Sequence, residues 1–136
     1  MFRSRRLYIM LLIAIVFVNF SVNFYSRNLP PRKVAFEFLE VLYTEKSLEK
    51  ALHLSSGYMK ETLFKFKDSR EATIFVFNQD FDSILITGQL VDNPELFAEK
   101  GGRIEVFYIG RKHRDSIKMS QTLILKQFDG CWYVVR

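Results

Sequence analysis

The chain has 136 residues, of which 49% are apolar. The apolar fraction excludes a disordered protein, and the length excludes a second, enzyme-sized domain. The formal net charge of +5 comes from the N-terminal segment. Residues 1–33 carry six basic side chains and no acid, whereas residues 34–136 carry 14 basic and 15 acidic side chains, a net charge of −1. Because a phosphate-binding surface needs a basic excess on the folded part, this distribution excludes nucleic acid as a partner.

The N-terminal segment is predicted to be an uncleaved membrane anchor at residues 7–25. Leu7 to Phe24 is a run without any charge, and as a helix it would measure about 27 Å, enough for the hydrocarbon core of a bilayer. A secretory signal peptide is the alternative. The run is longer than a usual signal peptide's apolar region, however, and bulky Phe24 and Tyr25 stand where a cleavage site would have small residues.

The basic residues around this segment indicate its orientation. Arg3, Arg5 and Arg6 in the stub of residues 1–6 favour a cytoplasmic N-terminus, although three basic residues between positions 27 and 33 reduce the asymmetry. The predicted location is the bacterial inner membrane, crossed once, with the lipid bilayer as a partner and the C-terminal domain outside the cytoplasm.

Residues 26–32 are predicted to be a tether, because Pro30 and Pro31 cannot continue a helix, although Pro31 suits the first turn of a new one. The folded domain then occupies residues 33–136 and opens with a helix. Its strongly polar residues are spaced four, three and four apart, so they form one narrow stripe on an otherwise apolar surface. We expect other elements of the fold to cover the rest of this helix, because its surface is apolar outside the stripe. The stripe consists of Lys33, Glu37, Glu40 and Thr44.

Three further segments before residue 82 carry helix signals. Ser47 and Ser56 precede short amphipathic stretches and are suitable capping residues. In residues 68–81 the signals conflict: Asp68 with Glu71 fits a capping box, whereas residues 72–77 are rich in residues that favour strands. We expect a helix there that leads into an extended segment.

After residue 82 the apolar period changes to two, which predicts strands. Gly88 indicates a bulge or a bend, Asp129-Gly130 a tight hairpin, and the stretch from Asn93 to Gly101 one short helical turn. The residues predicted to share a face within each strand are Ile84, Ile86 and Leu90; Ile104, Val106 and Tyr108; and Ile117, Met119, Leu123 and Leu125, before a last strand over residues 131–135.

This order predicts an α+β fold in which an N-terminal transmembrane helix precedes a small cone of about three helices on a curved antiparallel sheet of about four strands. Residues 30–136 resemble the nuclear transport factor 2-like (cystatin-like) cone, in particular small bacterial envelope members related to the lumazine-binding type. The opening helices carry the resemblance together with Gly130 and Trp132, since members often end in a Gly-x-Trp strand. Membrane-anchored members of the superfamily include assembly components of type IV secretion machines.

No catalytic, cofactor-binding or metal-ligating site is predicted. The resemblance implies that an enzyme of this kind would use acidic, His, Tyr or Arg side chains inside the cone's cavity. Here His53 is interpreted as a helix-surface residue, His113 as part of a solvated turn, and Asp80 and Asp82 as turn residues. Cys131 is the single cysteine, so it forms no internal disulfide.

Two sets of residues are candidates for binding. The first is the densest charge on the domain, which suits anionic headgroups or an acidic partner, although a charged hairpin tip is more often a solvated loop. The second would line an apolar cavity, and the alternative is that its members are core residues. The candidate interaction surface consists of Arg111, Lys112, His113 and Arg114, and the candidate pocket lining of Ile86, Tyr108 and Trp132.

The sequence favours a membrane-tethered, non-enzymatic module that docks onto other envelope proteins, with a secretion or conjugation apparatus as one setting. One alternative is an extracytoplasmic binding domain for a small apolar or lipid ligand, which needs an open cavity. Another is an enzyme of the isomerase or dehydratase type, which needs a buried acid or histidine in that cavity. A filled core with an exposed apolar patch would favour docking.

Overall fold

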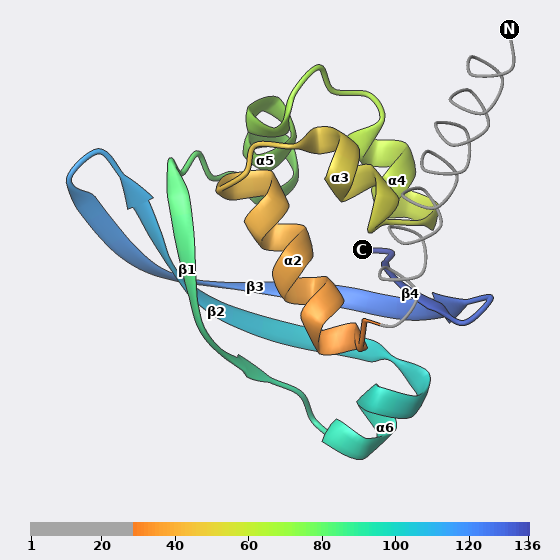
Figure 1. The fold of residues 1–136 in the computed structure, drawn as a ribbon. Helices are drawn as coiled ribbons and strands as arrows, with labels where there is room; N and C mark the ends of the chain where they lie inside the picture. Colours follow the sequence, from red (N-terminus) through yellow and green to blue (C-terminus); the bar gives the residue numbers. More distant parts are fainter. Residues whose placement is uncertain (1–28) are drawn as a thin grey trace, which may run out of the picture.

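A computed structural model describes residues 29–136, which form an α+β fold (Figure 1). Within this range the sheet has four antiparallel strands in the order β1-β2-β3-β4, so the predicted meander is confirmed, and five helices replace the expected three. The helices are α2 (Pro31–Tyr43), α3 (Leu48–His53), α4 (Gly57–Leu63), α5 (Ser69–Phe77) and α6 (Pro94–Lys100), and the strands are β1 (Ser83–Leu90), β2 (Gly102–Lys112), β3 (Asp115–Phe128) and β4 (Cys131–Val134).

The predicted stub and anchor, with Arg3, Arg5 and Arg6, lie outside the described residues. Among residues 29–136, no helix is both long and apolar enough to cross a bilayer. The first described helix begins at Pro31, inside the stretch expected to be tether.

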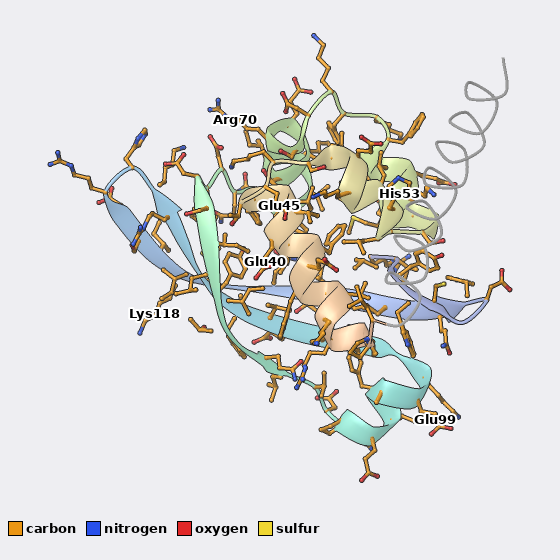
Figure 2. All side chains as sticks on the ribbon, in the orientation of Figure 1. Glu40, Glu45, His53, Arg70, Glu99 and Lys118 are labelled. Carbon is orange, nitrogen blue, oxygen red and sulfur yellow. The ribbon has the colours of Figure 1, made fainter. Side chains whose placement is uncertain are left out.

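The central helix of the fold is α2. Pro30 precedes it in an extended conformation, and Pro31 stands in its first turn, where no amide donor is needed. The predicted polar stripe stays at the surface, as exposed Lys33, Glu40 (labelled in Figure 2) and Thr44 show. The rest of the helix is wrapped, as expected. Its buried side chains include Val34, Ala35, Phe38, Leu39, Val41, Leu42 and Tyr43.

The helix α5 resolves the conflicting signals of residues 68–81. The Asp68 carboxylate accepts a hydrogen bond from the Glu71 amide at 2.9 Å, which caps the helix as predicted. The helix then continues to Phe77 and ends at Asn78, whose backbone is left-handed, so the expectation of an extended segment was wrong for residues 72–77. Burial of Ala72 and Thr73 on one helical face outweighs the strand propensity of this stretch.

The first strand contains the bulge predicted at Gly88, where the register with β2 shifts between Ile86 and Gly88. The extra residue reverses the alternation of side chains beyond it. Gln89 therefore continues the inner face, which points toward α2, and Leu90 is 59% exposed. The prediction that Leu90 shares a face with Ile84 and Ile86 was wrong for this reason.

The other strands follow the predicted alternation. Ile104, Val106 and Tyr108 are all buried on the inner face, whereas Ile117 is 51% exposed because it lies near the far end of the β2–β3 hairpin. The β3–β4 turn has positive φ at both central residues, 51° at Asp129 and 80° at Gly130. This is the backbone of the tight hairpin that an Asp-Gly pair favours.

Aromatic rings fill the space between α2 and the sheet. The Tyr43 ring of α2 lies with its centroid 6.0 Å from that of Tyr108 and 5.7 Å from that of Phe81, and Phe81 meets Tyr108 edge to face. The Phe81 ring occupies the place that a side chain at Gly110 would take. The inner face of the sheet is therefore packed rather than hollow at this point.

This packing predicts a difference between two strand glycines. A methyl group at Gly110 would meet the Phe81 ring, whereas one at Gly88 would have no atom within 4 Å. Gly110→Ala is expected to lower the free energy of unfolding by about 1–3 kcal/mol through overpacking, and Gly88→Ala to change it by less than about 0.5 kcal/mol. Urea unfolding followed by circular dichroism measures both, and equal values would contradict the packing described.

Candidate interaction surface

The side of the sheet opposite α2 carries apolar side chains that no element of residues 29–136 covers. Helices α2 to α5 lie on one side of the sheet (Figure 1), and side chains alternate across it. Leu85 is 66% exposed, Phe128 47% and Phe107 37%, and Ile109 and Ile124 are half-buried. We call this the outer sheet face and define it by Leu85, Leu90, Phe107, Ile109, Ile124 and Phe128.

An open hollow of about 550 Å³ lies at the centre of this face. The bulge contributes to it, because the register partner of Phe107 on β1 is Gly88, which has no side chain. Lys118 brings a cation to the rim and projects away from the helices (Figure 2). The hollow is lined by Thr87, Phe107, Tyr108, Ile109, Lys118, Met119 and Ser120.

The predicted basic tip, residues 111–114, is tied to the body of the domain by two acids. Asp80 forms ion pairs with Arg70 at 2.9 Å and with Lys112 at 3.3 Å. Partial burial of the Asp80 carboxyl raises its pKa, but the two cations outweigh this effect and hold the pKa below its usual value. The Asp82 carboxylate accepts a hydrogen bond from the His113 amide at 2.8 Å. Asp80 and Asp82 therefore hold the hairpin to α5 and to the start of β1.

Two of the four candidate interaction residues thus bond to the carboxylates of these acids. The Lys112 ammonium donates to the Asp80 carboxylate, and the His113 backbone amide donates to the Asp82 carboxylate. The backbone of His113 is in the left-handed region. The side chains of Arg111 and Arg114 are exposed. The tip therefore offers fewer unengaged cations than its sequence indicates.

The candidate pocket residues do not share one wall. Ile86 and Tyr108 are register partners, and Tyr108 pairs in turn with Met119 on β3. Trp132 pairs with Gln127, eight residues further along β3, which corresponds to about 27 Å of strand. It packs over Gly101 instead.

Among residues 29–136, the buried ionisable side chains are those of two tyrosines. Tyr43 and Tyr108 are 0% and 1% exposed, and neither hydroxyl has a hydrogen-bond partner of normal geometry within the described residues. Burial, and then the neighbouring Tyr108, raise the pKa of Tyr43, and burial raises that of Tyr108. The other buried polar side chains of residues 29–136 are Ser55, Thr62, Ser69 and Thr73. His53 is exposed on α3 (Figure 2).

Among residues 29–136, no group of His, Cys, Asp or Glu could hold a metal ion. Cys131 is half-buried in β4.

The outer sheet face was not recognised from the sequence, although a signal for it exists. In β1 and β2, apolar residues occupy successive positions, as in Ile84-Leu85-Ile86 and Val106-Phe107-Tyr108, so both faces of these strands are apolar. That pattern is typical of strands covered on both sides. Here only the inner side is covered by residues 29–136.

No protein-family model, no curated protein and no solved structure matches this chain.

The ion pairs of Asp80 give a testable stability effect. Asp80→Asn is expected to lower the free energy of unfolding by about 1 kcal/mol or less, since Arg70 and Lys112 are largely exposed and such pairs are weak. Asp92→Asn, at an exposed position that forms no ion pair within residues 29–136, is expected to leave it unchanged. Urea titrations at neutral pH compare the two, and an equal effect would show that Asp80 does not hold the hairpin.

The buried tyrosines give a pH dependence at alkaline pH. Folding raises the pKa of a buried tyrosine above its ordinary value of about 10. The stability of the folded state is therefore complete below about pH 10 and is lost as the pH rises from there toward the raised pKa, because only the unfolded chain releases the proton in that range. The free energy of unfolding is therefore expected to fall above about pH 10, and the fall to be smaller in Tyr43→Phe than in the original chain. Exposed Tyr58 provides the control: Tyr58→Phe should keep the full fall. Identical curves for all three proteins would contradict this.

Proposed function

We propose that this chain is a membrane-tethered, non-enzymatic docking module that binds another envelope protein through its outer sheet face. The observation that carries the proposal is the combination of a filled interior with exposed Leu85, Leu90 and Phe107 on the uncovered side of the sheet. Exposed apolar groups of this kind mark binding surfaces in soluble domains.

The composition of the outer sheet face supports a protein partner. Apolar residues on neighbouring strands lie next to each other, since Leu85 is the register partner of Ile109. Polar and charged residues lie among and beside them, since Lys118 is the register partner of Ile109, Ser120 that of Phe107 and Arg103 that of Ile124. Protein–protein interfaces usually combine apolar contacts with polar ones in this way.

The shape of the hollow favours a protein over a small molecule. Small-molecule sites enclose most of their ligand, whereas this hollow is open to solvent and lies on the outside of the sheet. A side chain that projects from a partner protein would fit into the hollow and pack against Phe107.

The predicted anchor at residues 7–25 supports a setting at the bacterial inner membrane, because confinement to a surface raises the effective concentration of the module near its partners. The helices followed by a bulged antiparallel meander are compatible with the nuclear transport factor 2-like cone, and this resemblance suggests a secretion or conjugation apparatus. Fold likeness alone does not transmit function, so the sheet face carries the proposal.

Chemical crosslinking of the full-length chain in native membranes, followed by mass spectrometry, tests the proposal. A defined set of envelope proteins should be recovered with the original chain. Leu85→Asp and Phe107→Asp place a charge within the apolar centre, and each is expected to reduce recovery of the same partners by about tenfold or more, as loss of an interface hot spot does.

The matched control is Leu96→Asp on α6, an exposed leucine that lies outside the outer sheet face. It should leave recovery unchanged, and circular dichroism of the purified variants establishes that all are folded. Equal recovery with Leu85→Asp and Leu96→Asp would refute docking through the outer sheet face.

A further inference from the structure

A second exposed surface lies on α4, away from the outer sheet face. Residues at helical spacing along α4 and its C-terminal end line an open hollow of about 580 Å³. Phe64, which follows the last residue of the helix, is 77% exposed, the largest value among the exposed large apolar side chains of residues 29–136. The residues of this stripe are Gly57, Lys60, Glu61, Phe64 and Lys65.

Aromatic and basic side chains alternate on this part of the chain. Tyr58 is 64% exposed beside the stripe, and Lys67 follows it at an exposed position. We call Tyr58, Lys60, Glu61, Phe64, Lys65 and Lys67 the α4 surface. It carries three lysines against one acid, and exposed aromatic rings beside lysines are the combination found where proteins meet the headgroup region of a bilayer.

The α4 surface lies on the part of the domain that the chain enters from its N-terminal side. Leu29 packs against the core just before α2, and α2 contacts β4. In turn Val135, the residue after β4, is joined to α4, because the Met59 amide donates to the Val135 carbonyl at 3.0 Å. The start of α2, β4 and α4 lie on the same side of the molecule in Figure 1.

The distance from the predicted anchor is short. The predicted anchor ends at Tyr25, so three residues lie between it and Leu29, and even a fully extended chain over these four steps spans only about 14 Å. If residues 7–25 cross the bilayer, the domain therefore lies close to the headgroups, and one of its faces must be turned toward them.

We propose that the α4 surface binds an anionic lipid surface and so orients the domain on the membrane. Phe64 and Tyr58 enter the headgroup region, and Lys60, Lys65 and Lys67 approach the lipid phosphates. The outer sheet face, on the opposite side of the sheet from the helices, remains turned away from the lipid and available to a partner (Figure 1). This inference requires the predicted tether of the proposed function, but not docking through the outer sheet face.

The experiment uses the full-length chain reconstituted in two kinds of vesicle, phosphatidylcholine alone and phosphatidylcholine with phosphatidylglycerol, each containing doxyl-labelled lipid as a quencher. A fluorophore is attached through Glu61→Cys in a Cys131→Ser background, which keeps the lysines and Phe64 in place. The matched control carries the fluorophore through Ser116→Cys, an exposed position near the β2–β3 hairpin tip.

Quenching is expected at position 61 in the vesicles that contain phosphatidylglycerol, with much weaker quenching in phosphatidylcholine alone and none at position 116. Changing Lys60, Lys65 and Lys67 to Gln should reduce the docked fraction by about fivefold for each lysine removed. Phe64→Ser should reduce it as well, while both variants still float with the vesicles.

Absence of quenching at position 61 in a chain that floats with the vesicles would overturn the inference and leave the anchor and the outer sheet face untouched. Equal quenching in both kinds of vesicle would overturn the assignment to anionic lipid. A crosslink from position 61 to a protein in native membranes, without quenching by lipid, would overturn it in favour of a protein partner. A chain that fails to float would remove the tether and this inference with it.

Discussion

The structure depends on the burial of one helix. α2 is apolar around most of its surface, and only a narrow polar stripe remains exposed to solvent. Leaving such a helix in water would expose many large side chains, each of which stabilises the fold by about 1.5–3 kcal/mol when it is buried. The sheet covers one side of α2, the short helices α3 and α5 cover others, and β4 contacts its flank. The remaining elements are therefore arranged around α2, and the aromatic contacts of Tyr43 with Phe81 and Tyr108 join it to the strands.

Filling the inner side of the sheet in this way has a consequence for function. The space between α2 and the sheet that could hold a small ligand is occupied by the rings of Tyr43, Phe81 and Tyr108. The two hollows described, one beside Phe107 and one beside Phe64, lie on the outside of the domain and are open. The proposed binding therefore uses surfaces on the outside of the domain. The outer sheet face and the α4 surface belong to different sides of the domain, so one can meet a partner while the other faces lipid.

Much of this fold could be predicted from the sequence where the signals were local. The polar stripe of α2, the cap at Asp68, the bulge at Gly88 and the Asp129-Gly130 hairpin each follow from a few neighbouring residues. The misplaced side chain, Leu90, lies just beyond the bulge, because one extra residue reverses every later side chain. The ion pairs of Asp80 were not predictable, since Arg70 and Lys112 come from distant parts of the chain. The outer sheet face was missed because apolar residues at successive positions could equally have been covered on both sides.

The central claim is that the outer sheet face is covered by another protein in the cell. The most direct test places a photo-crosslinking amino acid at position 85 of the full-length chain and, as a control, at position 40 on the exposed stripe of α2. Irradiation of intact cells is expected to give a discrete adduct to one envelope protein from position 85 and none from position 40. Adducts of the same kind from both positions, or from neither, would contradict docking through the sheet.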